Sequence, residues 1–322
     1  MKVLVTGGAG YIGSHTAKAL LKAGITPVVF DNLSRGNSWA LKFGEFAEGD
    51  LSDKARIRQV LSEHKIEAVI HFAAFINVGE SVPHPELYFR NNTANALTLF
   101  EAMREENVRR LVFSSTAAVY GDPQMPVLSE SHPTNPVNPY GESKLAVENM
   151  LKWFSPAFPL GYVALRYFNA SGADPDGEVG EAHDPETHLI PRIIFAAQGK
   201  IDAIDVFGTD YPTPDGTAIR DYVHVLDLAD AHIRALRYLE QGGESTAFNL
   251  GSGKGFSVKE VIDTVEKVSG RKVPVRYGPR RAGDPPLLIA DSKKANETLG
   301  WKTEYTLEQI VQTAWNWHSR RP

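Results

Sequence analysis

The feature that most constrains this chain is a glycine-rich turn near its N-terminus. Gly7, Gly10 and Gly13 follow the apolar run Val3–Val5 and open a helical pattern, Ile12–Ala23. Glycines at this spacing permit a tight turn, let the backbone approach a pyrophosphate, and bring the helix close to the strand. The N-terminus of the helix adds partial positive charge at the same point. This order of strand, turn and helix predicts a dinucleotide-binding unit of the Rossmann type.

The first half of the chain repeats the same alternation. Short apolar runs, typical of strands buried on both faces, alternate with helical patterns. The predicted strands are Val3–Val5, Pro27–Phe30, Ala68–Phe72, Leu111–Phe113 and Val163–Leu165, and the predicted helices are Ile12–Ala23, Lys54–Glu63, Glu86–Glu105 and Glu142–Phe154. Repeated βα units predict an α/β fold with a doubly wound parallel sheet of the Rossmann type and right-handed crossovers.

The second half of the chain has a different texture. After Asn169, loops rich in Pro, Gly and Asp separate shorter helices and strands. A chain of 322 residues exceeds a typical domain of about 100–200 residues, so two lobes are expected. We expect a Rossmann-type dinucleotide-binding domain over residues 1–168 and a smaller C-terminal α/β substrate domain over residues 169–322. A helix and strand pattern within Val223–Leu250 leaves open a return of part of that segment to the first domain.

Composition excludes several kinds of chemistry. The chain has no cysteine, which removes disulfides, thiolate nucleophiles and cysteine-ligated metal centres. Its net charge is −5, and its basic clusters, Arg109–Arg110 and Arg280–Arg281, are isolated pairs, which argues against nucleic-acid binding. No apolar signal segment precedes Lys2, and no run of about 18 apolar residues occurs. We therefore expect a cytoplasmic protein with no membrane association.

An acidic residue after the second predicted strand bears on the kind of dinucleotide. Asp31 lies roughly 20 residues beyond the glycines, where a carboxylate can accept both ribose hydroxyls. A 2′-phosphate would meet its negative charge, so NAD is favoured over NADP, although the nearby Arg35 complicates this inference. Asp50 follows a further short strand, where it could meet the adenine or cap the next helix.

Tyr140 and Lys144 are the strongest candidates for catalysis. Their i, i+4 spacing places a phenol and an ammonium one above the other on a helix face. Tyrosine titrates near ~10, and Lys144 together with a positive nicotinamide ring is expected to lower that pKa toward neutrality. Such a pair alone is usually a surface feature, but downstream of this glycine turn a general base is favoured. Thr116, which follows a strand, could bind the same substrate hydroxyl or simply cap a turn.

A series of ordered segments carries a resemblance to a known family. They are Thr6–His15, Asp31–Leu33, His71–Ala74, Val78–Ser81, Asn91–Asn92, Phe113–Gly121, Tyr140–Lys144, Leu165–Gly172, Arg220–Asp230 and Arg280–Asp284. With them the chain resembles the extended short-chain dehydrogenases, and among these the UDP-glucose 4-epimerases, over nearly its whole length. The resemblance implies that a Tyr140 phenolate takes the C4 hydroxyl proton of a UDP-hexose while NAD takes the C4 hydride. The transient 4-keto sugar then rotates within the pocket, and the hydride returns to the opposite face of C4.

The resemblance also assigns residues to the two ligands. Thr116, Tyr140 and Lys144 stand at the family's catalytic positions. The implied NAD contacts are Gly7, Gly10, Tyr11, Ile12, Gly13, Asp31, Asn32, Asp50, Leu51, Phe72, Ala73, Ala74, Asn92, Ser114, Tyr140, Lys144 and Tyr167. The implied UDP-sugar contacts are Thr116, Tyr140, Asn169, His188, Leu189, Arg220, Arg281, Asp284 and Leu288. Arginine suits a diphosphate because its planar fork bonds two oxygens.

One position separates related activities. Nucleotide-sugar 4,6-dehydratases and decarboxylases of this superfamily carry an acidic residue just after the catalytic hydroxyl, whereas this chain has Ala117 and Ala118. The leading hypothesis is therefore simple 4-epimerisation of UDP-glucose and UDP-galactose. One alternative is 4-epimerisation of another UDP-sugar, such as an N-acetylhexosamine, a pentose or a uronic acid. The other is a non-catalytic NAD sensor, which would have no need of the joint presence of Thr116, Tyr140 and Lys144.

Three positions depart from the pattern of many relatives. Ile76 replaces a lysine that touches the cofactor, which predicts weaker NAD retention, and His188 replaces an asparagine that helps to hold the sugar nucleotide. Leu288 replaces a tyrosine that walls the pocket beside the sugar C2, so an N-acetyl group could fit, unless Leu288 fills the space with neighbouring loops. The segment Glu181–His188 contains His and Glu residues, but their spacing fits no ligand motif, and we expect no metal.

The family further suggests a homodimer. Helices Glu86–Glu105 and Glu142–Phe154 would pack between two copies as a four-helix bundle. The apolar residues Leu97, Leu99, Phe100 and Met103 could form the contact face. They could equally pack against their own sheet, which also needs an apolar stripe.

Overall fold

Residues 1–281 and 284–320 are described by a computed structural model. In this part of the chain, seven parallel strands form the main sheet in the order β11-β7-β5-β4-β1-β2-β3. They are β1 (Lys2–Thr6), β2 (Thr26–Asp31), β3 (Glu45–Glu48), β4 (Ala68–His71), β5 (Arg110–Thr116), β7 (Gly161–Tyr167) and β11 (Thr246–Leu250). The strands are added outward from β1 on both sides, first β2 and β3 on one side and then β4, β5, β7 and β11 on the other. The predicted doubly wound parallel sheet is therefore confirmed.

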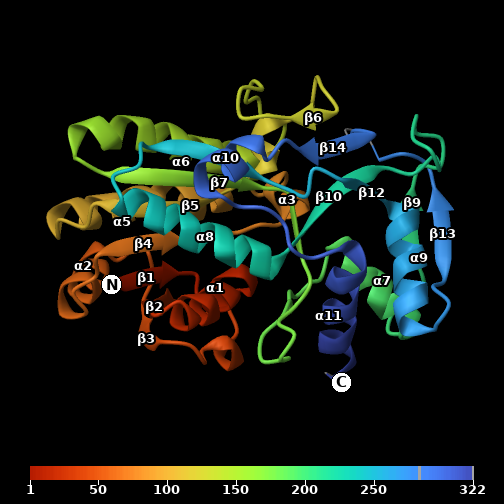
Figure 1. The fold of residues 1–322 in the computed structure, drawn as a ribbon, viewed down its shortest axis with the longest axis horizontal. Helices are drawn as coiled ribbons and strands as arrows, with labels where there is room; N and C mark the ends of the chain where they lie inside the picture. The colour runs from red at the N-terminus through yellow and green to blue at the C-terminus, as the bar shows by residue number, and fades with distance from the viewer. Residues whose placement is uncertain (282–283, 321–322) are drawn as a thin grey trace.

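Helices cover both faces of this sheet (Figure 1). One face carries α2 (Lys54–Glu63), α5 (Asn95–Glu105) and α6 (Pro139–Ala157), and the other carries α1 (Tyr11–Lys22), α8 (Val225–Glu240) and α10 (Lys293–Leu299). Strand residues alternate between the two faces. Leu4 packs in the first apolar cluster, whereas Val3 and Val5 pack in the second. Burial on both faces explains why the strands are continuous apolar runs in the sequence.

A smaller α/β lobe follows, to the right of the main sheet in Figure 1. Its strands are β6 (Val127–Leu128), β8 (Asn169–Ser171), β9 (Ile204–Phe207), β10 (Ile219–His224), β12 (Gly255–Ser257), β13 (Val275–Gly278) and β14 (Leu287–Ala290). β10 lies at the centre, paired with β8, β12 and β14, while β9 pairs with β13. Helices α7 (Leu189–Ala197), α9 (Val258–Ser269) and α11 (Leu307–Ser319) share one apolar cluster with these strands. The smaller C-terminal lobe is as predicted.

The chain passes more than once between the two lobes. Helix α8 packs against α1, and β11 pairs with β7 at the edge of the main sheet. Residues 225–250 thus sit with the first lobe, although β10 just before them and β12 just after them belong to the second. We propose a cofactor domain made of residues 1–168 apart from β6, together with residues 225–250 and α10.

The predicted helix Glu86–Glu105 is interrupted. Its path consists of α4 (Pro85–Tyr88), a wider π-helical turn η2 (Phe89–Ala94) and α5. Three of the four residues expected on a dimer face, Leu99, Phe100 and Met103, are fully buried in their own core, so that expectation was wrong for them. Leu97 is exposed. The helix must cover the sheet first, and only its outer face can meet another molecule.

Short helices complete the chain: α3 (Val78–Ser81), η1 (Ser38–Ala40) and η3 (Ala117–Tyr120). Among the helices of residues 1–281 and 284–320, none has the length and apolar character needed to cross a bilayer.

Candidate active site

A cleft of about 810 Å³ lies at the carboxyl ends of the central strands. Ligands of open α/β sheets bind in this place, where the strand order reverses. Most of the predicted site residues line it, namely Gly7, Gly10, Tyr11, Ile12, Gly13, Asp31, Asn32, Asp50, Leu51, Phe72, Ala73, Ala74, Ser114, Thr116, Tyr140, Lys144, Tyr167, Asn169, His188 and Leu288. The cleft walls come from both lobes, so residues far apart in sequence meet in one space.

The glycine turn packs closely against the residues that follow β4. Gly7 has a φ of +72°, and a Cβ added there would lie 2.6 Å from the backbone nitrogen of Ala73. A Cβ at Gly13 would collide with the carbonyl oxygen of Gly7. Gly10 is the N-cap of α1 and uses no side-chain cap. The free amide groups of this helix N-terminus therefore face the cleft without side chains in the way, which fits a pyrophosphate.

Asp31 is fixed at the end of β2 by the turn itself. Its carboxylate accepts hydrogen bonds from the backbone nitrogens of Ala9 at 3.0 Å and Leu33 at 2.9 Å. Burial raises the pKa of Asp31, and these hydrogen bonds oppose the rise. Arg35, the residue that complicated the choice between NAD and NADP, forms an ion pair with Glu80 at 3.0 Å. Its guanidinium also stacks on Phe75, 5.3 Å from the ring centre.

Asp50 lines the same end of the cleft. Its carboxylate accepts from the Asn32 side chain at 2.6 Å and from the Ser52 backbone nitrogen at 2.8 Å. The side-chain cap of α2 is instead Asp53, which accepts from the Arg56 nitrogen. Asp50 therefore closes a local turn, while the capping role considered for it belongs to its neighbour.

Tyr140 and Lys144 project from the first turns of α6. Asn138 caps this helix and Pro139 opens it, which fixes where its first turn begins. The Lys144 ammonium donates to the Ser114 carbonyl oxygen at 2.9 Å and lies 5.0 Å from the centre of the Phe113 ring. Burial lowers the pKa of Lys144 to about 7.

The expected lowering of the tyrosine pKa, which invoked a bound nicotinamide ring together with Lys144, stays a prediction. Burial raises the pKa of Tyr140, and a hydrogen bond with Thr116 opposes the rise. In the chain by itself, the effect of burial on the pKa of Tyr140 exceeds the opposing effect of Thr116, while the Lys144 ammonium donates to the Ser114 carbonyl oxygen on β5. Thr116 also caps η3 by accepting from the Ala118 nitrogen at 3.1 Å, so it fills both roles considered for it.

Asn92 has a positioning role in the protein. It lies in the wide turn η2, is 2% exposed, and is absent from the cleft lining. Its side chain accepts from the Phe75 nitrogen at 2.8 Å and donates to the Phe75 oxygen and the Ser143 hydroxyl, both at 3.0 Å. Asn92 thus ties the segment after β4 to α6. A direct contact of Asn92 with the cofactor stays a prediction.

The predicted diphosphate residues are absent from the cleft lining and are held by other partners. Arg220 donates to the Pro285 oxygen at 2.9 Å and pairs with Asp284 at 3.2 Å. Arg281 stacks on Phe207, with the guanidinium 4.5 Å from the ring centre. Leu189 begins α7 outside the lining. Residues 282 and 283, part of the segment that carried the resemblance, lie outside the described residues.

Leu288 supports both interpretations of its role. Its side chain lines the cleft, as a gate beside the sugar would. It also packs against the apolar cluster of Ala117, Val119, Tyr120, Leu128 and Leu145, as a space-filling residue would.

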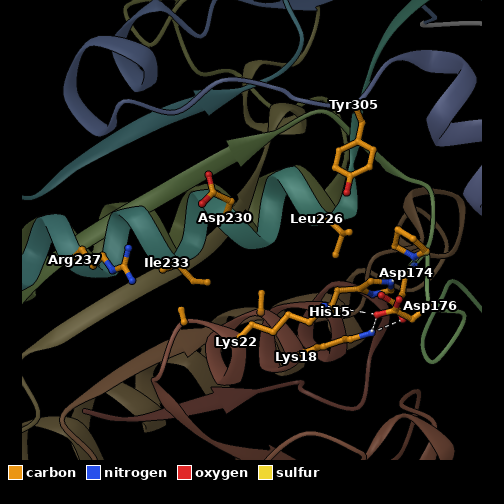
Figure 2. Close-up of a pocket in the computed structure, with 13 residues that line it drawn as sticks. His15, Lys18, Lys22, Asp174, Asp176, Leu226, Asp230, Ile233, Arg237 and Tyr305 are labelled. Atoms are coloured by element: carbon orange, nitrogen blue, oxygen red, sulfur yellow. Dashed lines mark hydrogen bonds and ion pairs between the residues drawn. The ribbon is translucent and has the colours of Figure 1, made fainter.

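The loop between β8 and α7, residues 172–188, closes the cleft from the side of the second lobe. The Tyr11 hydroxyl donates to the Gly172 oxygen at 2.6 Å, and Asn37 donates to the Ala182 oxygen. The Lys18 ammonium binds Asp174, Asp176 and Glu178 at 2.6–2.7 Å, and Figure 2 shows two of these ion pairs. Lys18, Asp174 and Asp176 line a separate groove of about 450 Å³ between α1 and α8. No linear motif indicates this Lys18 clamp, because Lys18 lies 156 residues before Asp174 in the chain.

The end of this loop holds a second cluster, Glu181, His183, Glu186 and His188. Burial by itself would lower the pKa values of both histidines, but the two carboxylates raise them to about 9 for His183 and about 10 for His188. The histidines lower the pKa of each glutamate in return, against the effect of burial. Linear spacing gave no reason to expect this cluster. The fold brings all four ligand atoms within 4.8 Å of one another.

Comparisons with known proteins agree with this geometry. The model of the NAD dependent epimerase/dehydratase family matches residues 3–251. The chain is 52% identical to UDP-glucose 4-epimerase of Lacticaseibacillus casei over 324 residues, which cover 100% of this chain and 98% of the relative. A solved structure of UDP-glucose 4-epimerase from Brucella ovis in complex with NAD is 51% identical, with a TM-score of 0.96 and coverage of 98% and 97%. The UDP-Glc/GlcNAc 4-epimerase from Campylobacter jejuni is 45% identical, with a TM-score of 0.88 and coverage of 99% of both chains.

Proposed function

Because the chain belongs to the NAD dependent epimerase/dehydratase family, we propose that its cleft epimerises UDP-hexoses at C4 and interconverts UDP-glucose and UDP-galactose. The observation that carries this is the meeting of Thr116, Tyr140 and Lys144 in one cleft with the glycine turn and Asp31. Incubation with a panel of UDP-sugars, followed by separation of the epimers, tests it. We expect UDP-galactose from UDP-glucose, and its absence from protein that contains NAD would reject the proposal.

The residues of the cleft fit NAD. Gly7 and Gly13, where a Cβ would collide with neighbouring backbone, let the turn pack closely at the N-terminus of α1, which suits a pyrophosphate, and Asp31 offers carboxylate oxygens for the ribose hydroxyls. Arg35 forms an ion pair with Glu80. Because its charge already has a partner, Arg35 gives little support for binding the 2′-phosphate of NADP. NAD held there would supply the acceptor and donor of a hydride at C4 of the sugar, which would allow inversion of C4 without net oxidation.

The chain's own residues handle the proton. In its ionised form, Tyr140 would accept the C4 hydroxyl proton and donate it back to the same oxygen. Thr116, hydrogen-bonded to Tyr140, holds the same hydroxyl in line. Lys144 is anchored on Ser114, one helical turn from Tyr140, and keeps the phenol and the end of β5 in register. Ala117 and Ala118 supply no further acid, which suits a reaction confined to C4.

The substrate side of the cleft is assigned to the uridine diphosphate and the sugar. Asn169 and His188 line the wall where the sugar nucleotide would lie, and Leu189 follows at the start of α7. Arg220 and Arg281 would bind the diphosphate, with Asp284 orienting Arg220. Neither arginine lines the cleft, so each side chain would have to leave its present partners to reach the phosphates.

A second substrate is favoured by one residue. Leu288, which lines the cleft, is smaller than the tyrosine expected in relatives confined to unacetylated sugars. The Campylobacter jejuni relative is a UDP-Glc/GlcNAc 4-epimerase. We propose that UDP-N-acetylglucosamine is epimerised as well, and the same UDP-sugar panel checks this.

We further propose that two copies pair through the outer faces of α4, η2, α5 and α6. Exposed apolar side chains gather on these helices: Leu87, Phe89 and Leu97 are 38–39% exposed and Trp153 is 79% exposed. Light scattering at micromolar concentration should give the mass of a dimer, and a monomer would reject it. A Trp153→Glu variant should weaken pairing, whereas Tyr277→Glu on the far lobe should not. A cytoplasmic location also stays a prediction.

A further inference from the structure

The end of the loop before α7 gathers four side chains of the kinds that bind metal ions. Glu181, His183, Glu186 and His188 each offer one ligand atom, and these atoms lie within 4.8 Å of one another. Imidazole nitrogen and carboxylate oxygen in a set of four are the ligands that zinc prefers. We propose that these four side chains bind one divalent transition-metal ion, zinc fitting best.

The distances between the ligand atoms suit a tetrahedral ion. His188 Nδ1 lies 2.9 Å from Glu181 Oε1 and 2.9 Å from Glu186 Oε1. His183 Nδ1 lies 3.1 Å from Glu181 Oε1 and 3.7 Å from Glu186 Oε2. Ligands bound tetrahedrally at about 2.0–2.2 Å are roughly 3.3–3.6 Å apart. Small side-chain adjustments therefore bring all four atoms to bonding distance of one centre.

Hydrogen bonds alone leave the cluster incompletely satisfied. Each Nδ1 carries at most one proton, and the hydrogen bonds formed are His183 with Glu181 and His188 with Glu186. Glu186 Oε2 has no hydrogen-bond partner, although its side chain is only 7% exposed. An unpartnered buried carboxylate oxygen is costly. A cation at the centre gives this oxygen a partner and balances both carboxylate charges.

A second group of carboxylates in the same loop provides a contrast. Asp174, Asp176 and Glu178 also place their oxygens within 4.8 Å of one another. The Lys18 ammonium, however, lies 2.6–2.7 Å from an oxygen of each of them. Figure 2 shows its pairs with Asp174 and Asp176. That group already holds a cation of the protein. Among the described residues, the only cations that pair with Glu181 and Glu186 are His183 and His188, which metal binding would deprotonate.

The position of the cluster suggests what the ion does. Glu181, His183 and His188 line the wall of the cleft, and His183 lies edge-on to Tyr11 with ring centres 6.1 Å apart. A metal would join both ends of the segment Glu181–His188 and hold this wall beside the glycine turn. The proposed role is structural, and it does not depend on the proposed epimerase activity.

Metal binding can be measured directly on the purified full-length protein. After treatment with a chelator and dialysis, titration calorimetry with zinc chloride should show one zinc per chain, and mass spectrometry of the dialysed complex should give the same ratio. Cobalt(II) should give the strong visible absorption of a tetrahedral site. Glu186→Gln and His188→Gln should each weaken zinc binding by at least about 10-fold, since even outer-sphere partners contribute 10- to 100-fold.

Two variants serve as matched controls. Asp176→Asn changes the carboxylate cluster that Lys18 occupies, and His84→Gln changes an exposed histidine, so both should bind zinc as the wild type does. A zinc content near zero after loading overturns the proposal, as does equal zinc affinity of the wild type and Glu186→Gln. Should Glu186→Gln fail to fold, by circular dichroism, His188→Gln decides the question, because its side chain is 42% exposed.

Discussion

The two halves of the cleft are prepared for their ligands to different degrees. In the cofactor half, Asp31 is held by two backbone amides and the glycine turn admits no side chain. In the substrate half, Arg220 is paired with Asp284 and Arg281 lies on Phe207. Groups that are already in place lose little freedom on binding, whereas groups with other partners must exchange them. The cofactor half is thus preorganised, and the substrate half has to rearrange.

The largest expected effect tests the chemistry at the border of the two halves. Tyr140→Phe keeps the ring and removes the hydroxyl, so kcat should fall by about 10²–10⁴-fold, the usual contribution of general acid–base catalysis. NAD content should stay as in the wild type, because the preorganised half is untouched. Steady-state kinetics and release of NAD by denaturation measure both. Tyr277→Phe, an exposed tyrosine, is the control. A variant that keeps more than about a tenth of the rate contradicts the assignment.

A change in the cofactor half should act on affinity. Asp31→Asn removes the charge that would accept the ribose hydroxyls, so NAD affinity should fall by about 10–150-fold, given roughly 1.5–3 kcal/mol for hydrogen bonds to a charged group. Fluorescence titration of cofactor-stripped protein measures it. The control is Glu48→Gln, because Glu48 lies opposite Asp31 in the register of β2 and β3. This variant should bind NAD with the affinity of the wild type. Wild-type protein that binds NADP as tightly as NAD would remove the role given to Asp31.

A change in the substrate half should act on the choice of sugar. Leu288→Tyr narrows the cleft, so the ratio of kcat/KM for UDP-N-acetylglucosamine to that for UDP-glucose should fall by about 5–150-fold, from an overpacking cost of about 1–3 kcal/mol. Leu287→Tyr, on the same strand but outside the cleft lining, is the control. An unchanged ratio, or a wild type that already rejects the acetylated sugar by more than about a hundredfold, would mean that Leu288 is not the gate.

The smallest expected effect tests whether the ion pair with Asp284 orients Arg220 for binding the diphosphate. Asp284→Asn should raise KM for UDP-sugars by no more than about fivefold with kcat unchanged, since partly exposed ion pairs contribute about 0–1 kcal/mol. Asp205→Asn removes a pair of the same length, 3.2 Å, with Arg276 on β13, and should not change KM. A decrease in KM would show instead that Asp284 competes with the substrate for Arg220.

Local features were predictable wherever residues close in sequence determine the outcome. The strand, glycine turn and first helix follow from apolar runs and from backbone positions that only glycine fills, as at Gly7 with its φ of +72°. Tyr140 and Lys144 share a helix face because of their spacing alone. The apolar face of α5 was also visible, but the sequence could not say whether it met the sheet or a second copy.

Several decisive features of the site depend on contacts that only the folded chain makes. Burial, which a sequence does not report, raises the pKa of Tyr140 and lowers that of Lys144. The Lys18 clamp and the pairing of Arg220 with Asp284 join residues about 156 and 64 positions apart. The segment Glu181–His188 fits no linear metal motif, yet its turns bring four ligand atoms together. Sequence spacing fixes periodicity and turn chemistry, whereas desolvation and long-range pairing are properties of the tertiary structure, because they depend on which distant residues exclude the water.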